Sequence, residues 1–171
     1  MSVAICELLG GDDLSRILVS LALALTASAA PAQTIATGDP AAMAKGLSAM
    51  GYKPGPIDPN GGAPILKVSI SDFETALAFG GCTDGKACKY LVLVSRFTDI
   101  KSPPGDWVNA RNAELDLGKA WVSEDGILSF SLPVPSGGEP VTAPMLRFII
   151  EQWQGVVGSL SQSAMAAKLV K

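Results

Sequence analysis

The chain has 171 residues, of which 48% are hydrophobic and 17% are charged, and its formal net charge is −3 at pH 7. That length suits one domain. Because the sequence contains no histidine, it excludes Ser-His and Cys-His catalytic pairs, His-ligated zinc and a histidine pH switch. The slight negative charge provides no field that would attract nucleic acid or an anionic membrane surface, so neither is expected as a partner.

The N-terminal segment has the pattern of a secretory signal peptide. A basic residue, Arg16, stands just before an apolar run over residues 17–25, and two Ala-x-Ala sites follow at 27–29 and 30–32. A charged start, a short apolar core and a small-residue site are typical of a cleaved leader. The run is shorter than the roughly 20 residues that a membrane-spanning helix needs. We therefore expect export to the periplasm, cleavage near Ala32 and no stable membrane insertion.

The sequence does not determine at which residue translation of this leader begins. Glu7, Asp12 and Asp13 put acidic side chains where signal peptides carry basic ones. One explanation is that translation begins at Leu14, read from a TTG codon, and that residues 1–13 are not translated. A Leu14 encoded by a CTN or TTA codon would contradict this explanation, and the first methionine would then be the start.

Removing a signal peptide of residues 1–32 leaves a short, loose leader over 33–39 and a single domain over 40–171. This mature chain keeps two cysteines, Cys82 and Cys88. An even pair in an exported protein indicates a disulfide. A working redox pair is the alternative, but such pairs favour Cys-x-x-Cys at the start of a helix, where the thiol pKa is lowered.

Turn residues and apolar periodicity predict three helices and six strands. Asp39 caps a first helix that has Pro40 at its first position and ends at Gly51. Pro54 and Pro56 confine the following strand to the edge of a sheet. The expected strands are 52–57, 65–70, 73–79, 90–94, 119–123 and 127–132, and the later helices are 102–116 and one that begins near residues 142–144.

The connections between these elements indicate hairpins. The turn-rich segment 80–88 joins two strands, and the expected disulfide ties its tip. Residues 124–126, Glu-Asp-Gly, form a second hairpin turn. Apolar residues at three-four spacing continue to Leu160 in the last helix, and the small, polar tail from Ser161 onward is expected to fray. The order α-β-β-β-β-α-β-β-α predicts an α+β fold in which helices flank an antiparallel sheet.

Short motifs spread over most of the mature chain form one set. They are Met50-Gly51-Tyr52, Cys82 and Cys88 ahead of the 90–97 strand, Val108-Asn109-Ala110-Arg111-Asn112, Gly118-Lys119-Ala120, Asp125-Gly126, Ser136-Gly137-Gly138 and Trp153. From about Ala41 to Leu160, the chain resembles the YbjN-domain family of bacterial sensory transduction regulators. The resemblance implies a fold like that of type III secretion chaperones and a non-enzymatic, regulatory or protein-binding role. A cytosolic regulator has no signal peptide, so this chain resembles an exported branch that acts in the periplasm.

Three residues of the middle helix are the candidate recognition surface. Asn109 and Asn112 are three positions apart on one face, and Trp107 lies close by. Asparagine is unfavourable inside a helix, so some interaction is expected to hold it there. The alternative to a recognition surface is hydrogen bonding to neighbouring loops or strands.

No motif for catalysis, a metal or a cofactor stands out. Gly80 to Ala87 comes close to a phosphate loop, but Ala87 replaces the Ser or Thr and a strand, not a helix, is expected to follow. The carboxylates are scattered, with no spacing that selects an acid–base pair or a calcium loop. We therefore predict no catalytic residue, no metal and no cofactor.

Together these patterns predict a non-enzymatic periplasmic protein that binds another protein, of unknown identity. Binding would use the apolar edge of the sheet or the grooves beside the helices, and a homodimer is one open form of it. One alternative is a thiol-active envelope factor that uses Cys82 and Cys88. A second is a small-ligand-binding protein, for which an interior pocket would be the sign.

Overall fold

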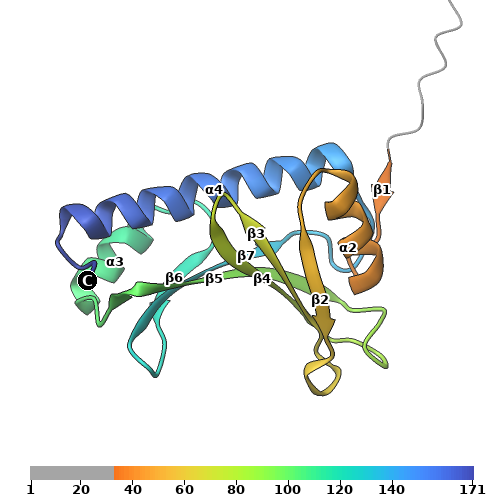
Figure 1. Ribbon diagram of the computed structural model, residues 1–171, viewed down its shortest axis with the longest axis horizontal. Coiled ribbons are helices and arrows are strands. Elements are labelled where there is room, and N and C mark those ends of the chain that lie inside the picture. Colours follow the sequence, from red (N-terminus) through yellow and green to blue (C-terminus); the bar gives the residue numbers. More distant parts are fainter. Residues whose placement is uncertain (1–32) are drawn as a thin grey trace, which may run out of the picture. The chain divides into compact units, whose positions relative to one another are not determined.

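A six-stranded antiparallel sheet forms the centre of the computed structural model, which describes residues 33–171 (Figure 1). In sheet order its strands are β2 (Pro54–Asp58), β3 (Ile65–Ile70), β4 (Phe73–Gly80), β5 (Tyr90–Lys101), β7 (Ile127–Val134) and β6 (Lys119–Val122). The remaining elements are the strand pair β1 (Thr34–Ile35) and β8 (Val141–Thr142), the helices α2 (Pro40–Ala49), α3 (Gly105–Ala113) and α4 (Ala143–Ala166), and the short 3₁₀ turn η2 (Asn60–Gly62). The predicted α+β class and element order are confirmed. The signal peptide and the choice of start residue lie outside the described residues.

The helices lie on one side of this sheet. Figure 1 shows α4 running across it, with α2 near one end of α4 and α3 near the other. The turns between β2 and β3 and between β6 and β7 project to the side away from α4. Strand residues alternate between the two sides, and those that face α4 form the core. We call the side away from α4 the open face.

The core is built around Trp153 of α4. Its ring stacks on Phe130 of β7, with the ring centroids 5.1 Å apart. Its indole Nε1 donates to the hydroxyl of Thr75 at 3.2 Å, and that hydroxyl lies 3.2 Å from the hydroxyl of Ser95. All four residues are at most 1% exposed. Two buried strand hydroxyls are therefore satisfied by each other and by the one tryptophan that crosses above them.

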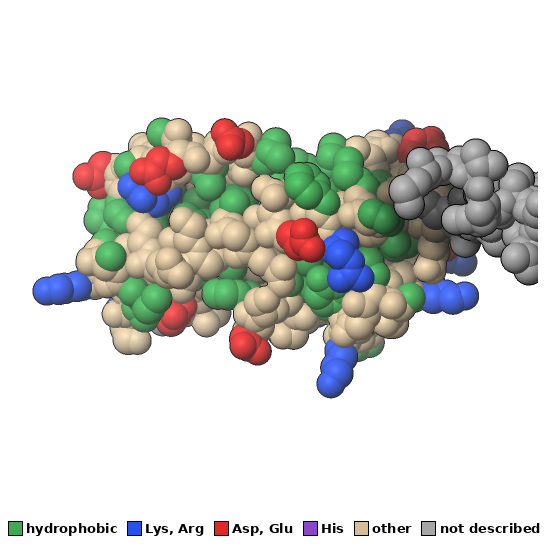
Figure 2. All heavy atoms as spheres, turned by 90° about the horizontal axis from the view of Figure 1, so that it is seen from above, with side chains coloured by type: hydrophobic (Ala, Val, Ile, Leu, Met, Phe, Trp, Pro, Cys, Tyr) green, Lys and Arg blue, Asp and Glu red, His purple; other side chains and the backbone are tan. Residues whose placement is uncertain are grey.

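Helix α4 extends further than its sequence pattern predicts. The fraying expected from Ser161 onward is wrong, because the helix continues to Ala166 and Ala164 is fully buried. Beyond the helix, Val170 forms a β-bridge with Ile100 of β5. The small residues of this segment allow close packing against the core, so the segment is helical although it lacks a clear division into apolar and polar faces. Seen from above in Figure 2, this side of the molecule carries few charged side chains along its central band.

The loose leader expected over residues 33–39 is also wrong. Thr34 and Ile35 pair with Thr142 and Val141, and Ile35 is only 3% exposed. Thr37 is 1% exposed, and its hydroxyl donates to the carbonyl of Glu139 at 2.7 Å. This segment is ordered by partners that lie about a hundred residues away along the chain, which no local pattern could reveal.

The middle helix is shorter than expected. It spans Gly105–Ala113 instead of 102–116. Ser102 has a positive φ of 50°, which is incompatible with a right-handed helix. At the other end, the amides of Glu114 and Leu115 donate to carbonyls three residues earlier, so the chain tightens out of the α-helical pattern.

Candidate functional site: the open face of the sheet

The three side chains predicted as a recognition surface lie in different surroundings. The carboxamide of Asn112 makes two hydrogen bonds to the backbone of Ala120 on β6. Trp107 is half-buried and packs against the core, whereas Asn109 is exposed. Two residues apart on a helix point about 200° from each other, so Trp107 and Asn109 cannot share a face. For Asn112 the structure supports the alternative of hydrogen bonding to a neighbouring strand.

The predicted disulfide between Cys82 and Cys88 is present at the tip of the β4–β5 hairpin. Cys88 is 2% exposed, and its backbone N–H donates to the carbonyl of Gly38 at 2.9 Å. A Cβ added to Gly38 would lie 2.7 Å from the carbonyl oxygen of Cys88, and one added to Gly138 would lie 2.6 Å from it. The bridge therefore shapes a surface on which two other segments pack closely.

The open face has an apolar floor. Register aligns side chains from neighbouring strands into rows: Ile65, Ala78, Val92 and Pro133 in the first, and Lys67, Ala76, Val94, Ser131 and Lys119 in the second. Arg96, Ser129 and Trp121 follow in the next row. The solvent side of an antiparallel sheet is usually polar. Here the two central strands, β4 and β5, present partly exposed alanine and valine instead.

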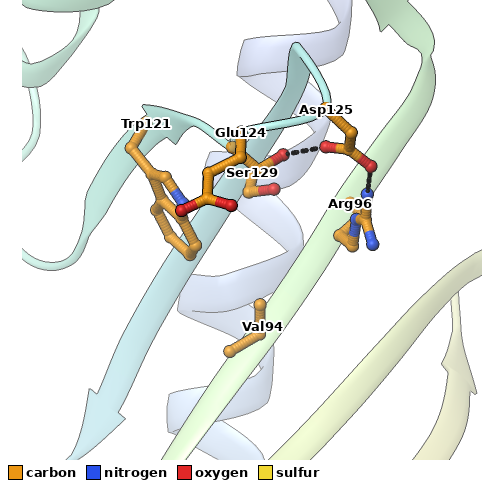
Figure 3. A pocket seen from close by; sticks show the side chains of 7 residues that line it. Val94, Arg96, Trp121, Glu124, Asp125 and Ser129 are labelled. Atoms are coloured by element: carbon orange, nitrogen blue, oxygen red, sulfur yellow. Dashed lines mark hydrogen bonds and ion pairs between the residues drawn. The ribbon is translucent and has the colours of Figure 1, made fainter.

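Two hollows lie side by side on this face and share Val94 and Arg96. The larger has a volume of about 950 Å³ and lies over β3, β4 and β5. The smaller has a volume of about 430 Å³ and is bounded by Trp121 and the β6–β7 turn. Figure 3 shows the smaller hollow with α4 behind the sheet, which places it on the side away from the helix.

A bulge in β5 shapes the rim of the larger hollow. Phe97 pairs with Leu128, but the next pair is Lys101 with Ile127, so residues 98–100 have no partners on β7. The last residues of the chain hold this bulge, because the Lys171 amide donates to the carbonyl of Asp99 at 3.1 Å. Bulges occur often next to binding sites, where they redirect side chains. This one brings Thr98 and Asp99 to the hollow.

Two ion pairs cross the open face. Lys67 Nζ lies 3.1 Å from Glu74 Oε1, and the guanidinium of Arg96 pairs with the carboxylate of Asp125. The pKa of Asp125 is lowered from its ordinary value, first by the hydrogen bond from the Ser123 hydroxyl and then by Arg96. Both effects stabilise the ionised carboxylate. Arg96, which lines both hollows, is thus held by Asp125 (Figure 3).

No local sequence pattern marks this face clearly. The run Tyr90 to Val94 was expected to be a strand, which is confirmed, but a continuous apolar run usually indicates a strand buried on both sides. The signal that could have found the face lies in β4, where Ala76 and Ala78 stand at positions that a solvent-facing side would fill with polar residues. Apolar residues on both sides of two adjacent strands indicate that the sheet has a second apolar surface in addition to the one that packs on the core.

Metal, phosphate and membrane binding each depend on features that can be compared with the part of the chain that the structure describes. Within residues 33–171, no group of three or more Cys, Asp or Glu side chains is arranged to hold a metal ion. The segment that resembles a phosphate loop leads into strand β5, so it provides no helix N-terminus for phosphate. In the same part of the chain, no helix combines the length and apolar character needed to cross a membrane.

The model of the YbjN family, described as "Putative bacterial sensory transduction regulator", matches residues 39–159. This range contains every strand of the six-stranded sheet and so the whole open face. No curated protein sequence and no solved structure gives a significant match. The likeness of the fold to type III secretion chaperones, which the YbjN resemblance implies, therefore stays a prediction.

Proposed function

Because the chain belongs to the YbjN family of bacterial sensory transduction regulators, we propose that it is a regulatory module that binds another protein on the open face and catalyses no reaction. The proposal also assigns it to the periplasm, as an exported member of the family. Both statements go beyond family membership, and each is supported by a separate set of observations.

The apolar floor is the observation that carries the binding role. Ile65, Val92 and Val94 remain partly exposed in a sheet whose other side already has a complete core. Contiguous apolar surface of this kind marks interaction sites in proteins. Trp121 stands at its edge (Figure 3), and tryptophan is among the residues that contribute most to binding when a partner covers them. A polypeptide segment lying across the sheet would cover this floor.

Export is supported by the N-terminal pattern and by the cysteines. A disulfide between Cys82 and Cys88 fits an oxidising compartment, where such bonds persist. The mature N-terminus, read by mass spectrometry from the native host, is expected near Gln33. A purified protein that keeps residues 17–32 would contradict both cleavage and the periplasmic location.

A small ligand in the larger hollow is the second candidate. Its volume of about 950 Å³ falls within the range of about 300 to 1,000 Å³ that small-molecule sites occupy. A thiol-active role is less well supported, because the pair lies between two strands and lacks the Cys-x-x-Cys spacing at the start of a helix that lowers a thiol pKa.

Site-specific photo-cross-linking in the native host tests the binding role. A photoreactive aromatic amino acid replaces Trp121 on the open face or, as a matched control, the exposed Gln152 on α4. A discrete cross-linked protein is expected from position 121 and not from position 152. Equal yields from both positions, or none from position 121, would rule out the open face as the binding surface.

A further inference from the structure

The charges around the open face indicate what kind of segment binds there. We infer that the partner segment is basic and amphipathic, with lysine or arginine at one end and apolar residues at the other. This inference rests on the proposed function and specifies the chemistry of its partner.

Carboxylates outnumber cations around the two hollows. The cations are Lys67 and Arg96, and the acidic residues are Asp72, Glu74, Asp99, Glu124 and Asp125. Each cation already forms an ion pair, Lys67 with Glu74 and Arg96 with Asp125. Among the residues that the structure describes, no ion pair involves the other three carboxylates, and all three are exposed. We call Asp72, Asp99 and Glu124 the acidic rim.

The acidic rim comes from three separate connections, all at the same end of the strands, two beside the larger hollow and one beside the smaller. Asp72 lies in the β3–β4 turn, Asp99 in the bulge of β5 and Glu124 in the β6–β7 turn. In the antiparallel register, the last residues of β5 lie between the start of β4 and the start of β7. At the other end, towards the disulfide, the row of Ile65, Ala78, Val92 and Pro133 carries no charge.

A segment complementary to this surface must therefore change character along its length. Its apolar residues would cover the row that contains Ala78 and Val92, and its cations would reach the acidic rim. Opposite charges at the rim of an interface mainly set orientation and speed of association, while the covered apolar residues supply most of the affinity. The uneven charge of this face would thus fix the direction in which a segment lies on it.

The same charges disfavour the other occupants. A second copy of this chain, docking with the same face, would bring the same surplus of carboxylates to the contact. Phosphate groups of lipids or nucleic acids would meet more carboxylates than cations around the two hollows. A basic segment of a different protein is the one occupant that satisfies both ends of the face.

The test compares two triple variants in the cross-linking experiment at position 121, carried out in an extract of the native host so that the salt concentration can be set. One neutralises the acidic rim with Asp72→Asn, Asp99→Asn and Glu124→Gln. The matched control removes the same number of charges elsewhere on the surface, with Asp116→Asn, Glu139→Gln and Glu151→Gln, and none of these residues lines either hollow. Thermal unfolding of both purified variants confirms that each is folded before cross-linking yields are compared.

We expect the rim variant to lose about fivefold or more of the cross-linking yield at low salt, and the control variant to keep it. Added salt should weaken the wild-type reaction, because exposed charges are screened beyond roughly 10 Å at 0.1 M. The cross-linked peptide should contain lysine or arginine. An unchanged yield in the rim variant, or a peptide without basic residues, would overturn the inference and leave the proposed binding role standing. No cross-link from position 121 in the wild type would overturn both.

Discussion

The carboxamide of Asn112 pairs with the backbone of Ala120 as a residue on a neighbouring strand would. Its Nδ2 donates to the Ala120 carbonyl at 2.9 Å, and its Oδ1 accepts from the Ala120 amide at 2.8 Å. Ala120 lies on β6, at one edge of the sheet. Unpaired edges invite pairing with other chains, so a side chain that occupies the edge protects the fold from that contact.

Replacing Asn112 by alanine should therefore lower the free energy of unfolding by about 1 to 3 kcal/mol, because the edge amide and carbonyl of Ala120 lose their partners. Urea denaturation measures the loss, and hydrogen exchange at the Ala120 amide should accelerate. Asn109→Ala, on the same helix but exposed, is the matched control and should change stability by no more than about 0.5 kcal/mol. Equal effects of the two changes would show that the hydrogen bonds to Ala120 contribute nothing.

The disulfide is expected to stabilise the hairpin tip and, through it, the N-terminal segment. Replacing both Cys82 and Cys88 by serine should cost up to about 2.4 kcal/mol, the loop-closure entropy of a ring of about seven residues. Because Cys88 donates to Gly38, hydrogen exchange at the Ile35 amide of β1 should also increase. Urea denaturation and hydrogen exchange measure the two effects.

The same double variant separates a structural bridge from a thiol-active one. A structural bridge predicts lower stability with retained cross-linking from position 121. A thiol-active factor predicts lost activity in a fold of unchanged stability, and that result would favour the alternative role for Cys82 and Cys88.

Trp153 should be the most sensitive aromatic residue of the core. Trp153→Phe removes the hydrogen bond to Thr75 and part of the ring stacked on Phe130. A loss of about 2 kcal/mol is expected from the unmade hydrogen bond and the remaining space. Trp107→Phe is the control, because Trp107 is only half-buried at the edge of the core. Thermal and urea unfolding should show the smaller loss for Trp107, and the opposite order would contradict the assignment of Trp153 as the central residue.

Elements with local signals were predictable from the sequence. Asp39 accepts a hydrogen bond from the Ala41 amide and begins α2 as expected, because capping depends on neighbours in the chain. The turn at residues 124–126 likewise joins β6 and β7. Turn chemistry and period-two alternation act over a few residues, so the order of strands along the chain could be read without the fold.

Features that depend on distant partners were not predictable. Strand β1 has only two residues, Thr34 and Ile35, and exists because β8 lies beside it. The bulge at residues 98–100 is a property of the pairing between β5 and β7. The open face arises only when alternate residues of several strands come together, so Val94 and Trp121 could not be assigned to one surface from their separate positions in the sequence.

The carboxyl group of Asp125 should titrate below its ordinary pKa of 3.8. The Ser123 hydroxyl, the largest cause, and then Arg96 favour its ionised form. Since the folded-state pKa is the lower one, this group stabilises the β6–β7 turn above its unfolded pKa. That contribution is lost as the pH falls through the folded value.

A carboxyl-carbon NMR titration measures the Asp125 midpoint directly. Ser123→Ala and Arg96→Gln should each move the midpoint up towards 3.8, because each removes a group that stabilises the carboxylate. Ser131→Ala is the control: it removes a hydroxyl from the same face that is not among the causes of the shift, so the midpoint should stay in place. A wild-type midpoint at or above 3.8 would show that Ser123 and Arg96 do not stabilise the ionised carboxylate of Asp125.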